Sequence, residues 1–159
     1  MQQKETINYG DFADITLVPA RGRIVAIDPG TKRVGVAVSD ENRLVSRPLQ
    51  VIDRTSWKKL LSEIRAVLNE FDAKALVIGL PLETNGEESA MSLEAREMAR
   101  KFQLSLNIPI FLQDERVTSY EAKSRLWSAG IDRKTARKSV DGEAAVVILN
   151  DFLERISAP

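Results

Sequence analysis

The sequence predicts an α/β fold in which a mixed, five-stranded sheet is flanked by helices. Two observations lead to this prediction. Three short apolar stretches separated by turn residues come first, and they are typical of an antiparallel meander. Stretches with helical periodicity then alternate with short buried runs, which is typical of parallel strands joined by crossover helices. With 159 residues, 43% of them hydrophobic, the chain is long and apolar enough for one domain with its own core.

Two apolar runs near the start of the domain predict a β-hairpin. Residues 24–27 and 34–38 lie on either side of the turn sequence Asp28-Pro29-Gly30. A third strand is expected over residues 44–51. Pro48 within it favours an edge or bulged position, because proline has no backbone N–H to donate to a neighbouring strand.

Helices and strands alternate in the remainder of the domain. A helix is expected from Thr55, because apolar residues from Trp57 to Phe71 recur on one helical face. Residues 75–79 follow as a short apolar run, which is typical of a central parallel strand. The remaining elements are a helix, a strand and two further helices, expected over residues 91–102, 109–112, 119–129 and 145–156.

The composition restricts the chemistry that this chain can perform. It contains no cysteine and no histidine, which excludes disulfides, Cys/His zinc sites, thiolate nucleophiles, Ser-His-Asp triads and a histidine general base. Its 23 basic and 23 acidic residues give a formal net charge of zero. The overall charge therefore indicates neither nucleic acid nor an acidic membrane as a partner, and a site for a polyanion has to be a local patch.

The first part of the chain is expected to be an extension. Residues 1–22 show no sustained periodicity and precede the expected folded domain of residues 23–159. Their polar start does not resemble a signal peptide. The longest apolar run, residues 144–149, is shorter than the about 20 residues that span a bilayer. Together with the absence of cysteine, these features lead us to expect a cytoplasmic protein without a membrane partner.

Acidic residues stand at three places of the kind where ligands of α/β sheets gather. Asp28 follows the first strand, and the pair Asp114-Glu115 follows the strand expected over residues 109–112. Asp141 comes just before the expected terminal helix, at a spacing from Ala145 that directs its carboxylate toward the apolar, sheet-facing side. Each acid alone also has an ordinary structural explanation: a turn-forming aspartate, a solvated loop and a helix N-terminal carboxylate, respectively.

Together, these acids predict a carboxylate site for hard divalent cations such as Mg²⁺ or Mn²⁺. Two such ions roughly 3.5–4 Å apart can activate a water on one side of a phosphodiester and stabilise the leaving oxygen on the other. Basic residues lie next to each acid in the sequence, and they could bind phosphates or simply form a solvated face. They are Lys32, Arg33, Arg116, Arg133, Lys134, Arg137 and Lys138. Because only 6% of the residues are aromatic, recognition of backbone and shape is favoured over base stacking.

Four ordered segments resemble the YqgF family of Holliday-junction-resolvase-like proteins, which are implicated in maturing the ends of 16S ribosomal RNA precursors. The resemblance covers residues 23–154, and the segments that carry it are residues 27–40, 77–81 with 85–87, 114–118, and 140–141 leading into 144–145. The family implies a ribonuclease-H-like fold for residues 23–159 and metal-dependent nuclease activity. By motif, its catalytic and metal-binding acids fall on Asp28, Glu115 and Asp141, with Mg²⁺ or Mn²⁺ as cofactor. Whether Asp114 takes part stays open.

The same resemblance implies phosphate-binding positions and exposes some departures. Its nucleic-acid-binding residues fall on Lys32, Arg33, Arg116, Thr118 and Lys138. Pro29 is as in RuvC-type resolvases, whereas Ser119 replaces a common threonine. In RuvC-type relatives the second acid ends the strand after the first helix, but here that strand runs into Gly79-Leu80-Pro81, which favours the YqgF branch.

Three functions follow from these observations. The first is a metal-dependent nuclease, which acts on structured RNA such as a 16S precursor in pre-ribosomal particles or, alternatively, on branched DNA. The second is a non-catalytic nucleic-acid-binding or ribosome-assembly factor. The third, an actin-like ATPase half, is disfavoured because such enzymes need two halves around a cleft. The protein is expected to be a monomer or a homodimer.

Overall fold

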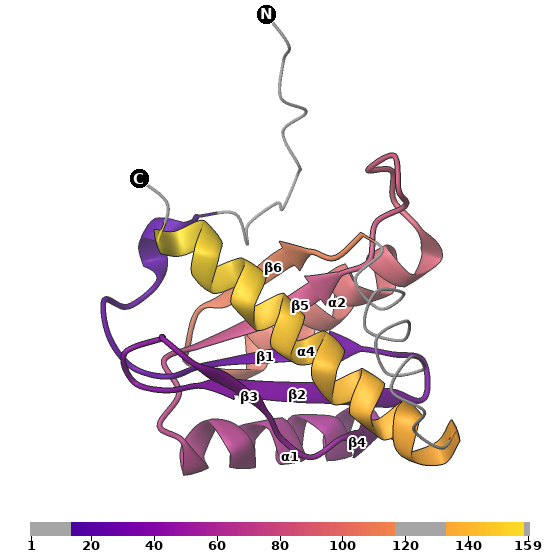
Figure 1. Cartoon of the computed structure of the whole chain (residues 1–159), viewed down its shortest axis with the longest axis horizontal. Helices are drawn as coiled ribbons and strands as arrows, with labels where there is room; N and C mark the ends of the chain where they lie inside the picture. Colours follow the sequence, from indigo (N-terminus) through magenta and orange to yellow (C-terminus); the bar gives the residue numbers. More distant parts are fainter. Residues whose placement is uncertain (1–13, 117–132, 158–159) are drawn as a thin grey trace, which may run out of the picture.

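The computed structural model describes residues 14–116 and 133–157, which form one mixed sheet with helices on both faces (Figure 1). The strand order is β3-β2-β1-β5-β6, and β4 also pairs with β2. β1 and β2 form an antiparallel hairpin, whereas β1, β5 and β6 run parallel. The strands are β1 (Ile24–Pro29), β2 (Arg33–Ser39), β3 (Ser46–Pro48), β4 (Ile52–Asp53), β5 (Ala75–Leu80) and β6 (Ile110–Asp114). The predicted α/β class and its mixed sheet are confirmed.

The third strand is shorter than the expected residues 44–51, and a further short strand, β4, follows just beyond that range, so the described sheet has six strands rather than five. β3 pairs with β2 and ends at Pro48. Proline cannot donate to the ladder, and β3 lies at the sheet edge as its sequence favoured. The Leu49 N–H then donates to the Val36 carbonyl at 2.8 Å, and β4 pairs with the start of β2.

Serine side chains fix where the first two long helices begin. The Ser56 hydroxyl accepts the Lys59 N–H at 3.1 Å and caps α1 (Trp57–Glu70). Ser89 caps α2 (Ala90–Ser105) and exchanges hydrogen bonds with Ser92 in a capping box. A short 3₁₀ helix, η2 (Ile15–Leu17), precedes the sheet. The helix expected over residues 119–129 lies outside the described residues.

The last helix, α4 (Arg133–Ser157), begins much earlier than predicted. Asp141 was expected just before this helix but lies within it, eight residues after its start, so a helix N-terminal role for this carboxylate is wrong. The reason is that five of residues 133–138 are arginine, lysine or alanine, which favour helix even where no apolar stripe shows. Gly142 allows α4 to pass close to β3, since a Cβ there would lie 3.1 Å from the Pro48 Cβ.

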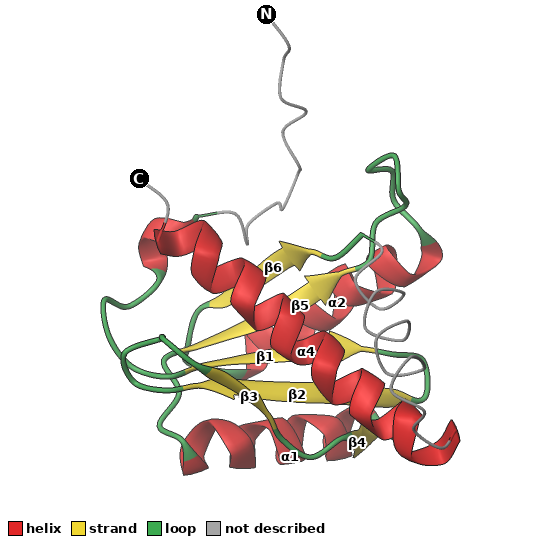
Figure 2. Ribbon diagram, in the orientation of Figure 1, coloured by secondary structure: helices red, strands yellow, loops and turns green. Residues whose placement is uncertain are grey.

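Two hydrophobic clusters hold the helices to opposite faces of the sheet (Figure 2). α1 and α2 pack against one face, where residues such as Ile27 and Ile78 point. α4 packs against the other face, where Phe111 of β6 meets Phe152 with ring centroids 5.3 Å apart. None of the helices in the described ranges is both long enough and apolar enough to cross a membrane.

Candidate active site

Asp28 lies at the carboxyl end of β1 and belongs to the face covered by α4. Side chains alternate along a strand, and Asp28 is in phase with Ile24 and Ala26, which are buried in the α4-side cluster. Its side chain is half-buried. Its partner across the hairpin is Gly35, which has no side chain to cover the carboxylate from β2.

Glu115 reaches the same face from β6. Its N–H donates to the Leu80 carbonyl at 3.0 Å, which continues the pairing of β6 with β5. The residue is only 8% exposed. A Cβ at Gly79 would lie 3.3 Å from the Glu115 Cγ and 2.6 Å from the Ile148 Cδ1. The glutamate side chain therefore lies over the bare backbone of β5, beneath α4.

Gly79 is the place where the two acids converge. The register that pairs Ile27 with Ile78 puts Asp28 beside Gly79 on one side, and Glu115 covers Gly79 from the other. Two carboxylates thus share one face at the carboxyl ends of β1 and β6, the parallel strands on either side of β5, as ligand-binding residues of α/β sheets do. Such a buried carboxylate is costly unless cations or hydrogen-bond donors compensate its charge.

Asp141 belongs to α4, the helix that covers this face of the sheet. Ile148 reaches Gly79 of β5 and Gly142 reaches Pro48 of β3, so the helix crosses the sheet face between these strands (Figure 1). Asp141 stands four residues before Ala145, which is fully buried against the sheet, and this spacing places both residues on one helical stripe. The Asp141 side chain lies outside the described part of the structure.

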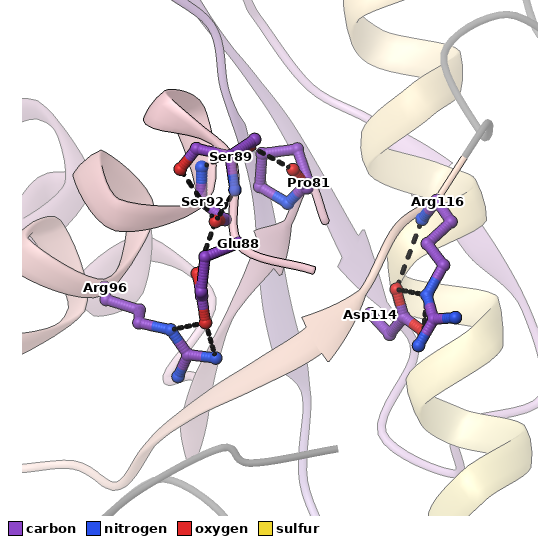
Figure 3. A network of polar contacts seen from close by, with 7 residues as sticks. All are labelled: Pro81, Glu88, Ser89, Ser92, Arg96, Asp114 and Arg116. Carbon is purple, nitrogen blue, oxygen red and sulfur yellow. Dashed lines mark hydrogen bonds and ion pairs between the residues drawn. The ribbon is translucent and has the colours of Figure 1, made fainter. Parts of the chain in front are cut away.

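Asp114 is directed to the other side of β6. Along the strand, it is in phase with Ile110 and Leu112, which belong to the cluster under α1 and α2. There it pairs with Arg116, whose Nε lies 3.2 Å from Oδ1 and 3.0 Å from Oδ2 of the aspartate (Figure 3). The structure therefore assigns Glu115, not its neighbour, to the face of Asp28, and makes Asp114 the partner of Arg116.

Arg116 also contacts the loop before α2. A Cβ at Gly86 would lie 3.0 Å from both terminal guanidinium nitrogens, and Gly86 has a φ of +87°, which favours glycine. The start of α2 carries a second polar network, in which Glu88 binds Arg96 and Ser92 (Figure 3). The hydrogen bond from Arg96 lowers the pKa of Glu88, helped by that from Ser92.

The other predicted phosphate-binding residues differ in how far the structure places them. Arg33 begins β2 in phase with Gly35 and Ala37, so it emerges on the face of Asp28. Lys32 is exposed in the turn between β1 and β2. Thr118 lies outside the described residues. Lys138 lies in α4, but its side chain is not in the described part.

The donor set fits a hard divalent cation, although the described side chains do not complete a site. Carboxylate oxygens are the ligands that Mg²⁺ and Mn²⁺ prefer, and the absence of a side chain at Gly79 lets Glu115 lie close to β5 on the face of Asp28. Within residues 14–116 and 142–157, no three acidic side chains are close enough to hold a metal. The third candidate ligand, Asp141, lies just outside these ranges.

Comparison with known proteins decides the family. Residues 22–155 match the family described as "RuvX: Holliday junction resolvase". The chain belongs to the RuvX family. It is 35% identical over 133 residues to a protein of Maridesulfovibrio salexigens named "Putative pre-16S rRNA nuclease", with 84% of this chain and 98% of the relative covered. A relative of the same name from Koribacter versatilis is 37% identical, with 84% and 88% covered.

A solved structure shows the same fold for this RuvX-family chain. The RuvC protein of T. thermophilus, in complex with a Holliday junction substrate, superposes with a TM-score of 0.52 at 17% identity. The comparison covers 86% of this chain and 96% of RuvC. The expected resolvase-like fold and the nuclease family are therefore confirmed.

Sequence reasoning did not identify the role of Gly79. The residue was noted only as part of a motif, yet it lies between the two acids, and Ile148 of α4 packs directly over it. A signal was present, because glycine inside a buried strand often marks a place where another group approaches the backbone closely.

Proposed function

We propose that this chain is a divalent-metal-dependent nuclease that cleaves phosphodiester bonds in structured RNA, during maturation of 16S ribosomal RNA precursors in the cytoplasm. The observation that carries the proposal is the convergence of Asp28 and Glu115 over Gly79 on the α4 side of the sheet. The RNA substrate is supported by the names of the relatives at 35% and 37% identity. Pre-ribosomal particles are the partner that such a substrate implies.

Each residue has a proposed role in this reaction. Asp28, Glu115 and Asp141 would hold Mg²⁺ or Mn²⁺. When bound, such ions supply an activated water and stabilise charge on the leaving oxygen. Arg33, on the same face as Asp28, binds the phosphate next to the one that is cut, and exposed Lys32 binds a phosphate farther along the strand.

Arg116 contributes to binding through a position fixed by its neighbours. Its Nε forms an ion pair with Asp114, and Gly86, which has no side chain, leaves space for its two terminal nitrogens. Planar guanidinium groups fixed in this way are suited to bidentate phosphate contacts. The burial of Glu115 keeps bulk water from one side of the acids.

A side-by-side cleavage assay tests the proposal. The purified protein is incubated with Mg²⁺ or Mn²⁺ and either a 16S precursor or a four-way DNA junction. We expect the RNA to be cut and the cutting to stop with EDTA or in Asp28→Asn, which removes a charge at almost constant size. The matched control is Asp72→Asn, because Asp72 lies after α1 at the other end of the sheet, is exposed, and has a φ of +48° that asparagine tolerates.

Each alternative outcome identifies a different function. Cutting of the junction alone would show a resolvase, the activity in the description of the matched family. Binding of RNA without cutting, unchanged in Asp28→Asn, would show a non-catalytic assembly factor. Loss of the folded state in Asp28→Asn, seen by circular dichroism, would show that this carboxylate is structural; Asp28→Ala in the same assay would then decide whether cleavage also depends on it.

A further inference from the structure

A cleft of about 420 Å³ lies on the α1–α2 side of the molecule, at the same end of the sheet as Asp28. Its walls are the first turn of α1, one stripe of α2 and the turn between β1 and β2, which contributes Thr31. This volume falls within the about 300–1,000 Å³ of small-molecule sites in proteins. The cleft does not include the acids of the candidate active site.

The wall next to the active site is held rigidly. Arg54 donates to the Gly30 carbonyl at 2.8 Å, and its own N–H donates to the Lys32 carbonyl at 2.9 Å. The Gly30 N–H in turn donates to the carbonyls of Asp28 and Arg33. The turn that follows Asp28 is therefore also a wall of the cleft, to which it contributes Thr31.

The cleft contains an aromatic ring and a cation. Trp57 is half-buried; its ring packs edge-on against Phe102, with centroids 4.7 Å apart, and borders the cleft. The Lys101 ammonium lies 5.4 Å from the centre of this ring. Leu60 and Met98, both buried, form an apolar floor.

The charges that line the cleft leave Lys101 available to a phosphate. Glu94 pairs with Arg54 at 2.7 Å, and Glu97 pairs with Arg100 at 2.6 Å. Among the described residues, no carboxylate lies within ion-pair distance of Lys101. Its ammonium lies over the Trp57 ring and, after Arg100, helps to lower the pKa of the Glu97 carboxyl; its flexible stem can carry it to an incoming anion. An aromatic face, an apolar floor and an available cation are the features with which proteins bind unstacked nucleotides.

We infer that this cleft binds one unstacked nucleotide of the substrate strand, next to the phosphate that is cut. The base stacks on Trp57 and the apolar floor, while Lys101 binds its phosphate. This inference rests on the proposed nuclease function and adds a requirement for a single-stranded nucleotide beside the cleavage point. It also adds base stacking to the recognition of backbone and shape that the composition favours, since one ring on a cleft wall is sufficient for one base.

Binding of a short single-stranded RNA tests the inference without relying on cleavage. The protein carries Asp28→Asn to prevent cutting and Trp127→Phe to make Trp57 the sole tryptophan, since the chain has two. We expect RNA to quench Trp57 fluorescence. Trp57→Leu keeps an apolar side chain against Phe102 but removes the stacking ring; measured by RNA anisotropy, it should weaken binding roughly 5- to 150-fold, the range for one stacked base. Trp57→Phe should recover part of this loss.

Matched variants separate the cleft from general effects on folding and charge. Phe71→Leu removes a ring at the other end of α1, where Arg47 lies 5.3 Å from its centre, and should leave binding unchanged. Lys101→Ala should weaken binding and reduce its salt dependence, whereas Lys58→Ala, an exposed lysine of α1 outside the cleft, should change both less.

The outcomes distinguish this inference from the proposed function. Unchanged binding in folded Trp57→Leu, or no quenching of Trp57, would overturn the nucleotide site even if the wild-type protein cuts RNA. Weakened binding in Trp57→Leu and Lys101→Ala would support the site even if the wild-type protein cuts nothing, in which case the nuclease proposal alone fails. If Trp57→Leu does not fold, the quenching of Trp57 and the effect of Lys101→Ala decide.

Discussion

Replacing Gly79 with alanine should disturb the active site through a single added carbon. The new Cβ would lie 2.6 Å from the Ile148 Cδ1, a distance that real Cβ atoms do not adopt, and 3.3 Å from the Glu115 Cγ. Ile148 is 1% exposed, so its side chain has little room to withdraw. Either α4 moves away from β5, or Ile148 takes a strained rotamer, and Glu115 shifts with the change.

The expected loss can be estimated from two opposing effects. Overpacking of a dense core typically costs about 1–3 kcal/mol. Alanine restricts the unfolded chain more than glycine does. Because Gly79 does not have a positive φ, this effect stabilises the folded state by about 0.4–1 kcal/mol. The difference spans about 0–2.6 kcal/mol. Because Ile148 is buried and has little room to withdraw, we expect Gly79→Ala to lower the free energy of unfolding by about 1–2 kcal/mol, or the melting temperature by about 2–8 °C for a chain of this size.

A double-mutant cycle with Ile148→Val tests this cause by chemical denaturation. Valine lacks the atom that the new Cβ would meet, and Ile148→Val alone should cost about 0.5–1.5 kcal/mol. In the Gly79→Ala background it should cost less or restore stability, giving a coupling of at least about 0.5 kcal/mol. Additive losses, or a Gly79→Ala protein as stable as the wild type, would refute the close packing of Ile148 against Gly79.

Three further predictions concern the neighbouring polar groups. Gly86→Ala should destabilise the protein by about 1 kcal/mol, because of its φ of +87°, and should weaken RNA binding by displacing Arg116; equal affinity in a filter-binding assay would contradict this. Asp114→Asn should weaken RNA binding several-fold while the bound metal is retained, as measured by calorimetry, because it releases Arg116 and touches neither acid over Gly79. Arg96→Met should lower stability at pH 7 by roughly 0.2–1 kcal/mol, since Glu88 is partly exposed. Arg96 lowers the folded-state pKa of Glu88 below its ordinary 4.5, so this stabilisation is present above pH 4.5 and is lost as the pH falls through the folded-state pKa. The free energies of unfolding of Arg96→Met and the wild type should therefore converge in acid. A difference that stays constant with pH would disprove the role of the ion pair.

The sequence predicted the strands and the long helices because their patterns are local. Alternation and apolar runs located β1, β2, β5 and β6, and the periodic face after Thr55 located α1. The start of α4 was missed because its first residues favour helix by propensity, without an apolar stripe that would show in the pattern. For the same reason Asp141 was placed before the helix rather than within it.

Asp28 and Glu115 were identifiable from the sequence because both follow apolar strands and because their motifs resemble a known family. Whether Asp114 also takes part was not, since adjacent residues of a strand point to opposite faces and only packing shows which face α4 covers. The pairing of Trp57 with Lys101 left no sequence signal either, because the two residues lie on different helices.

By itself, then, the sequence determined which segments form most of the strands and helices, and it excluded histidine and cysteine from any chemistry of this chain. These properties depend on residue type and on spacing along the chain. The tertiary structure decided that Glu115 and Asp28 lie on either side of Gly79 and that Asp114 forms an ion pair with Arg116. It also placed a cleft beside the turn between β1 and β2. These relations depend on parallel pairing between β1, β5 and β6 and on helices packed against opposite faces, which bring together residues that are distant in the sequence.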